Sequence, residues 1–140
     1  METWKHSFLS LILVAVSYPL FGWQSIIIFA GGVLIDIDHY FWYAYRYRKL
    51  SVIACYRHFI AGIKKKDFSE NFGILLVFHT IEFLAFVVVL SFYSKIALIF
   101  LIGLLPHYLL DAIFIYTLAK RVISDHSVIH WAYKNLIQKV

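Results

Sequence analysis

The stretch GGVLIDIDHYFWY, residues 31–43, places three ionisable side chains inside a strongly hydrophobic segment. Asp36, Asp38 and His39 stand within four positions, and a cluster of aromatic residues follows them. An ionisable residue inside a membrane span costs about 2.5–3.5 kcal/mol on insertion scales, so such residues usually face the interior of a helix bundle and carry a function. The stretch therefore indicates a membrane helix with a buried polar site.

The composition also indicates a membrane protein. The 140 residues are 62% hydrophobic and 15% charged, whereas soluble domains are about 45–50% apolar and about 25% charged. The length predicts one domain, residues 1–140. The only cysteine, Cys55, excludes an intramolecular disulfide, and a structural thiol is favoured over a reactive one.

Four hydrophobic segments predict an all-α fold, an integral membrane four-helix bundle. A spanning helix needs about 20 predominantly apolar residues. The predicted spans are residues 5–20, 24–47, 72–92 and 95–119. Residues 48–71 predict an amphipathic interfacial helix in the middle loop, and residues 120–140 predict an amphipathic cytoplasmic tail.

Basic residues predict the orientation of these spans. Counted from Arg46 at the end of the second span, seven Lys and Arg residues precede the third span and four follow the fourth, whereas Lys95 alone lies in the two short opposite loops. Because basic residues favour the cytoplasmic side, we expect a multi-pass protein of the cell (inner) membrane with both termini cytoplasmic. The lipid bilayer is the expected partner, and no nucleic-acid partner is expected. A homo-oligomer is compatible with the sequence.

Histidine and carboxylate side chains recur at similar depths in the predicted spans. At a rise of about 1.5 Å per residue, those of the second and third spans lie about 10–15 Å from the cytoplasmic ends, and those of the fourth about 13–20 Å. The same estimate places His6, in the first span, closer to the cytoplasmic end than these residues. Residues three or four apart share one helix face. The pairs with this spacing are Asp36/His39, His79/Glu82 and His107/Asp111.

This layer of side chains predicts a metal site, because inward-facing carboxylates and histidines are the ligands of metal sites in helix bundles. Imidazole and carboxylate ligands without cysteine suit Zn²⁺, Mn²⁺ or Fe²⁺, as one ion or two. Asp38 lies off the shared face and is a candidate for a supporting role. A buried ion-pair network that joins the helices is the alternative. The predicted metal ligands are His6, Asp36, His39, His79, His107 and Asp111.

Four short motifs resemble the inner-membrane metal-dependent hydrolases, the YdjM-like group. That family carries an early His, a PDIDH segment, a THS-type segment and a GYxxHxxxD segment. The corresponding stretches here are KHSFLS with His6, LIDIDHY, FHTIEF with His79, and GLLPHYLLD, and they extend to about Ala119. Ile35 stands where the family has proline, and NFGILLVF stands where it has HRG.

The resemblance implies a metal-dependent hydrolase. The depth of the polar layer places its site in the cytoplasmic half of the membrane, and a lipid phosphoester is a candidate substrate. Water activated by the metal would be the nucleophile. Glu82 or Asp38 is the predicted general base, and Arg46, Arg48 and Arg57 are the predicted phosphate-binding residues. The alternatives are a metal-ion or proton transport module and a di-iron oxidising enzyme.

Overall fold

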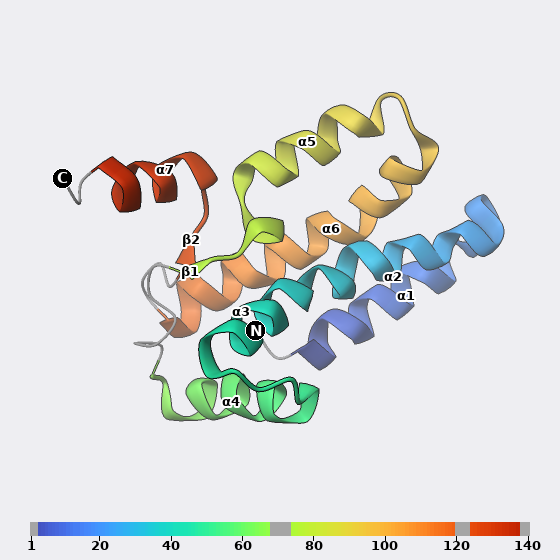
Figure 1. Ribbon diagram of the computed structural model, residues 1–140. Helices are drawn as coiled ribbons and strands as arrows, with labels where there is room; N and C mark the ends of the chain where they lie inside the picture. The colour runs from blue at the N-terminus through green and yellow to red at the C-terminus, as the bar shows by residue number, and fades with distance from the viewer. Residues whose placement is uncertain (1–2, 68–73, 120–123, 138–140) are drawn as a thin grey trace.

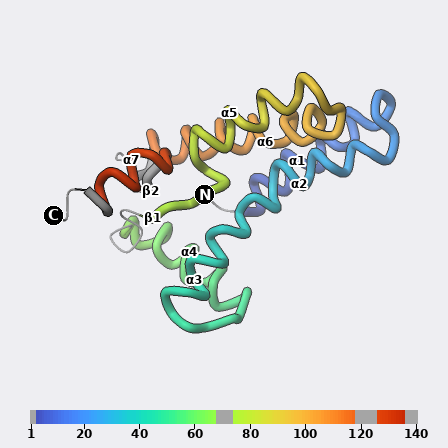
Figure 2. Tube along the Cα trace, turned by 45° about the horizontal axis from the view of Figure 1, so that its top comes forward, coloured from blue at the N-terminus to red at the C-terminus, as the bar shows by residue number. Residues whose placement is uncertain are grey.

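The structure is a computed structural model that describes residues 3–67, 74–119 and 124–137. The chain is mostly helical, as predicted. Helices α1, α2 and α6 lie side by side, and α5 packs along α6 (Figure 1). Figure 2 shows α3 and α4 projecting from one end of these long helices. The main helices are α1 (Thr3–Phe21), α2 (Ile26–Val33), α3 (Ile37–Tyr47), α4 (Val52–Lys65), α5 (Ile81–Ser91) and α6 (Lys95–Phe114).

Two helical stretches, Thr3–Tyr47 and Lys95–Thr117, are long and apolar enough to cross a membrane. The first stretch is folded back on itself, so that α1 and α2 pack together. The reversal occurs at Gly22, whose φ of 56° is a conformation that glycine adopts without strain. Pro19 lies within the last turn of α1, which continues to Phe21.

The second predicted span, residues 24–47, contains a joint. A 3₁₀ turn at Leu34–Asp36 separates α2 from α3. Asp36 occupies the position before α3, but its side chain accepts no hydrogen bond from the first turn of that helix. The carboxylate is therefore not a helix cap, and it points into the polar cluster described below.

Glycines bring α2 and α6 into close backbone contact. A side chain at Gly31 would collide with the carbonyl oxygen of Phe100, and one at Gly103 would collide with that of Ile28. Small residues of this kind let membrane helices approach closely. The contact sets the height of α6 relative to α2, and it therefore sets the position of His107.

The third predicted span, residues 72–92, is helical only from Ile81. Before α5 the chain forms a short strand β1 (Ile74–Leu75) and a 3₁₀ turn at Val77–His79. The hydroxyl of Thr80 caps α5 by accepting a hydrogen bond from the Phe83 amide at 3.3 Å. The predicted helix is thus too long: the observed one rises about 16 Å, roughly half of the hydrocarbon core of a bilayer.

The strand β1 pairs in parallel with β2 (Ser124–Asp125), and the sequence did not predict this pair. Beyond it, α7 (Val128–Ala132) continues into a π-helical turn at Tyr133–Ile137. The predicted helix of the middle loop is confirmed as α4, which begins after Ser51, whose hydroxyl accepts a hydrogen bond from Ala54 N.

The outer faces of the long helices are apolar. Large hydrophobic side chains of α1 are exposed along its whole length, from Trp4 and Phe8 to Val16 and Leu20. A soluble protein rarely exposes apolar patches of this extent, which mark contact with protein or membrane. The buried core lies where α5 and α6 meet the joint after α2.

Candidate metal centre

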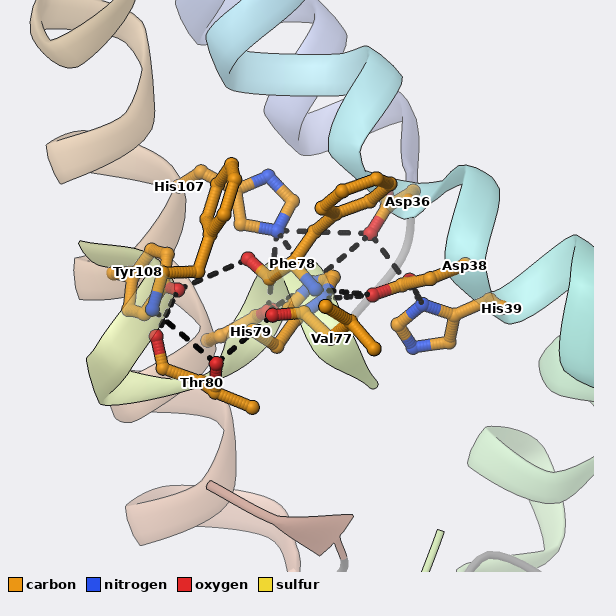
Figure 3. A network of polar contacts seen from close by, with 11 residues as sticks. Asp36, Asp38, His39, Val77, Phe78, His79, Thr80, His107 and Tyr108 are labelled. Atoms are coloured by element: carbon orange, nitrogen blue, oxygen red, sulfur yellow. Dashed lines mark hydrogen bonds and ion pairs between the residues drawn. The ribbon is translucent and has the colours of Figure 1, made fainter. Parts of the chain in front are cut away.

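Four separate parts of the chain bring histidine and aspartate side chains together. His6 comes from α1, Asp36 from the joint before α3, and His79 from the 3₁₀ turn before α5, while α6 supplies His107 and Asp111. Figure 3 shows His79, His107 and Asp36 pointing toward one another. Asp36, His79, His107 and Asp111 were expected to share one layer, and the structure brings them together. His6, which was expected to be shallower, joins them.

Two imidazole nitrogens have two carboxylate oxygens beside them, and we call these four atoms the central site: His79 Nε2, His107 Nε2, Asp36 Oδ1 and Asp111 Oδ2. The two nitrogens are 3.1 Å apart. Asp36 Oδ1 lies 3.5 and 3.6 Å from them, and Asp111 Oδ2 lies 3.6 and 3.2 Å from them. Ligands held about 2.0–2.1 Å from a tetrahedral Zn²⁺ are separated by about 3.3 Å. The central site could therefore hold a metal ion.

Hydrogen bonds on the far side of each ring assign the protons of His79 and His107. His107 Nδ1 lies 2.9 Å from the carbonyl oxygen of Gly32, and His79 Nδ1 lies 3.0 Å from Asp38 Oδ2. A carbonyl or carboxylate oxygen only accepts, so each Nδ1 carries the hydrogen. In the neutral rings both Nε2 lone pairs then face each other between two carboxylates. A cation, either a metal ion or a proton, would make this arrangement favourable.

Asp38 holds two of the imidazole rings in place. It accepts hydrogen bonds from His39 Nδ1 at 3.0 Å, from His79 Nδ1 at 3.0 Å and from the Phe78 amide at 3.1 Å. A carboxylate behind a ligating histidine fixes the ring's tautomer and orientation. This geometry supports an orienting role for Asp38. Its predicted role as general base stays a prediction, since both of its oxygens already accept hydrogen bonds.

His39 lies beside the central site rather than within it. Its Nδ1 is 3.8 Å from Asp36 Oδ1 and closer to Asp38. Its Nε2 has no hydrogen-bond partner among the residues that the structure describes, and 27% of its side chain is exposed. The ring also packs edge-on against Phe59 of α4 at 5.2 Å. His39 is therefore placed to meet a bound molecule.

His6 lies deeper than the depth estimate predicted. Its ring is 1% exposed and stacks on His107 with centroids 3.9 Å apart. Its Nε2 is 3.3 Å from Asp111 Oδ1, the oxygen that does not face the central site. His6 Nδ1 is buried with no hydrogen-bond partner in the described part of the chain. The residue count did not predict this position, because it contains no information about how α1 packs against α6.

Glu82 points away from the central site. Its carboxylate accepts hydrogen bonds from Ser127 Oγ at 2.6 Å and from the amides of Val128 and Ile129 at 3.1 and 3.4 Å. It thereby joins α5 to the start of α7. The predicted shared face of His79 and Glu82 is wrong, because His79 precedes α5. No contact to the cluster supports the predicted catalytic role of Glu82, which stays a prediction.

The predicted phosphate-binding arginines, Arg46, Arg48 and Arg57, are exposed. Arg48 ends α3 with a φ of 55° and its guanidinium lies over the ring of Tyr45 at 5.3 Å. The three side chains do not line the cavity beside the central site. Their predicted role as phosphate ligands therefore gains no support from their positions.

A cavity of about 770 Å³ opens beside the central site, between α3, α4, β1 and the end of α6. Asp36, His39, His79 and Asp111 contribute to its wall, and apolar side chains make most of the remainder. Cys55 also lines it, and burial raises the pKa of its thiol. The raised pKa favours the neutral thiol, which agrees with a structural rather than a reactive cysteine.

Sequence reasoning missed the residues that hold the turn around His79. The hydroxyl of Tyr108 lies 2.9 Å from the carbonyl oxygens of both Phe78 and Thr80 and donates to them. Tyr108 directly follows His107, so its position in the PHYLLD stretch was the available signal. The carbonyl of Gly32, which orients His107, left no signal in the sequence because any residue has such a carbonyl.

Comparison with known proteins finds no match to this chain among family models, curated proteins or solved structures.

Proposed function

We propose that this protein is a membrane-embedded, metal-dependent hydrolase that binds its ion at the central site. The observation that carries the proposal is the pair of Nε2 atoms 3.1 Å apart, each of which has an oxygen of Asp36 and an oxygen of Asp111 beside it. The four motifs that resemble the inner-membrane hydrolases contain all of these residues and add weight to the proposal.

Zn²⁺ is the ion that we propose, with Mn²⁺ as the alternative. Two imidazoles and two carboxylates without a thiolate suit both ions. Each carboxylate oxygen lies 3.2–3.6 Å from the two nitrogens, and these separations suit neighbouring ligands of a tetrahedral Zn²⁺ ion. A single ion satisfies the central site. A second ion beside His6 would take His6, His107 and Asp111 as ligands, and it would therefore share His107 and Asp111 with the central site.

The reaction proposed is hydrolysis of a lipid ester, with a phosphoester as the first bond to assay. Water adds to the phosphorus atom, the bond to the lipid oxygen breaks, and a proton passes to that leaving oxygen. A divalent cation would lower the pKa of the attacking water. His39, whose Nε2 faces the cavity while Asp38 holds its Nδ1, is the residue that we propose to carry the proton.

The membrane setting of the proposal rests on three features. Two helical stretches are long and apolar enough to span a bilayer, the outer face of α1 is apolar, and basic residues gather between α3 and the end of α4. We propose a multi-pass protein of the cell membrane with both termini and α4 on the cytoplasmic side.

The cavity favours hydrolysis over a metal-ion or proton pathway. A pathway needs polar groups that continue across the membrane. The buried polar side chains outside the cluster are three hydroxyls in the described part of the chain, those of Ser10, Ser25 and Thr80. An open cavity beside the ligand atoms instead provides room for a substrate.

The test is elemental analysis and a lipid phosphatase assay on the purified protein. We expect about one Zn²⁺ per chain and phosphate release from phosphatidic acid vesicles. Asp36→Ala and His107→Ala should lose both the metal and the activity. His130→Ala, a histidine exposed on α7, is the matched control and should keep both. Unchanged metal content in the first two variants would refute the proposed site.

A further inference from the structure

The cavity beside the central site has walls of two kinds. Its polar groups are concentrated where Asp36, His39 and His79 meet. Asp36 Oδ1 lies 3.8 Å from His39 Nδ1 and 3.5 Å from His79 Nε2, and the two rings pack edge to face with centroids 4.9 Å apart. Its other walls are largely aliphatic and aromatic. The apolar lining includes Ile37 of α3, Phe59, Ile60 and Ile63 of α4, and Leu76 and Phe114.

A cavity with one polar end and otherwise apolar walls suits an elongated apolar molecule that carries one polar group. Ligand sites have volumes of about 300–1,000 Å³ and combine apolar walls with a few convergent polar groups. The cavity, at about 770 Å³, lies within this range. A small polar substrate would contact the histidines and aspartates but would leave the apolar walls of α4 uncovered.

The mouth of the cavity is continuous with an exposed apolar surface. Val52 and Tyr56 of α4 line the cavity, yet 67% and 48% of their surfaces are exposed. Ile53, also on α4, is 65% exposed and does not line the cavity. An amphipathic helix with apolar and basic residues lies in the boundary between lipid headgroups and chains. A lipid in that layer would reach the cavity without crossing water.

We propose that this cavity binds one acyl chain of a membrane lipid, with the polar end of the lipid directed at the central site. The position of the ester rests on the proposed hydrolase function, whereas binding of the chain does not. Burial of the acyl chain against α4 would bind the lipid in the cavity whichever headgroup the lipid carries.

Cys55 provides a direct test, because the only cysteine of the chain lines the cavity and is 6% exposed. In lipid nanodiscs, N-ethylmaleimide should alkylate Cys55 slowly, and monododecanoylglycerol should slow the reaction further. This probe is uncharged, so protection reports the chain rather than attraction to the basic residues of α4. Monobutanoylglycerol, with the same headgroup and a four-carbon chain, should protect far less.

A matched pair of variants on α4 separates binding in the cavity from partitioning into the bilayer. Ile60→Trp fills part of the cavity, whereas Ile53→Trp adds the same side chain to the outer surface. If the indole displaces two methylenes of the chain, protection of Cys55 should require about tenfold more monododecanoylglycerol in Ile60→Trp. Ile53→Trp should behave like the unaltered protein.

Equal protection by the twelve-carbon and four-carbon probes, or equal responses of the two variants with unchanged thermal unfolding, would overturn the acyl-chain site. A phosphatase activity found without protection of Cys55 would also reject it and leave the hydrolase standing. Protection that persists in His107→Ala, together with no hydrolysis by the unaltered protein, would support the chain site and reject the proposed function. The two failures are therefore distinguishable.

Discussion

Asp38 contacts three donors with two oxygens, and two of these donors are imidazole nitrogens. It therefore acts on the central site through His79, whose Nε2 belongs to that site, and through His39, which faces the cavity. At the scale of single residues, the arrangement of protons in the site depends on Asp38 and on the carbonyl of Gly32. Neither group contacts the space between the two facing Nε2 atoms.

Replacing Asp38 with asparagine should weaken metal binding without removing a ligand. The amide would not accept both imidazole hydrogens and the Phe78 amide with the strength of a carboxylate, so His79 would lose its fixed tautomer. Loss of such a supporting contact lowers metal affinity about 10–100-fold. Competition with a chromophoric chelator measures this change.

Asp67→Asn, an exposed aspartate just after α4, is the matched control for Asp38→Asn and should leave the affinity unchanged. If Asp38→Asn kept the full affinity of the unaltered protein, the orienting role assigned to Asp38 would be incorrect.

At the scale of secondary-structure elements, the contact between α2 and α6 decides where His107 lies. Gly103 is one turn before His107, and its Cα faces the backbone of Ile28. The His107 ring is in turn bonded to Gly32 of α2. The two helices thus position this imidazole only while their backbones touch.

Gly103→Ala should separate α2 from α6 and loosen the central site. The added methyl group would collide with the carbonyl oxygen of Ile28, and overpacking of this kind costs about 1–3 kcal/mol. Thermal unfolding should begin at a lower temperature, and the bound metal should decrease because His107 moves from Gly32.

Leu105→Ala, an exposed position on the same helix, serves as the control and should change stability by no more than about 0.5 kcal/mol. A Gly103→Ala protein with unchanged stability and metal content would show that the glycine contact does not position His107.

The element that the sequence described least well is α5. The length of the hydrophobic segment predicted a helix over residues 72–92, yet α5 begins at Ile81, where the Thr80 hydroxyl caps it. The preceding residues pair with Ser124 and Asp125, about 50 positions later in the chain. Local pattern does not report such a partner, whereas it correctly predicted α4 and α6, whose hydrogen bonds join residues only four apart.

At the scale of the whole molecule, the central site lies at the end of the bundle from which α3 and α4 project (Figure 2). Basic residues gather at the same end, on α4 and around Arg48. The short connection between α5 and α6, which includes Tyr93, lies at the opposite end of these helices (Figure 1). The proposed orientation therefore places the site near the cytoplasmic surface.

Labelling of single cysteines tests this orientation. In a Cys55→Ala background, Tyr93→Cys and Lys65→Cys each add one thiol at an exposed position. A membrane-impermeant maleimide should react with Tyr93→Cys in right-side-out vesicles and with Lys65→Cys only in inside-out vesicles, because basic loops stay cytoplasmic. Labelling of both positions from the same side would contradict the proposed topology.

The sequence by itself determined the helical character of the chain and the residue types of the polar cluster. The helical character follows from the apolar segments, which depend on residues close together in the chain. Ionisable groups are costly in lipid whatever the fold, so His79, His107, Asp36 and Asp111 could be predicted as a group. Only the tertiary structure decided which atoms face one another. Asp38 accepts hydrogen bonds from His39 and His79, His39 lines the cavity, and Glu82 joins α5 to α7. The contacts of Asp38 with His79 and of Glu82 with Ser127 join segments 40 or more residues apart.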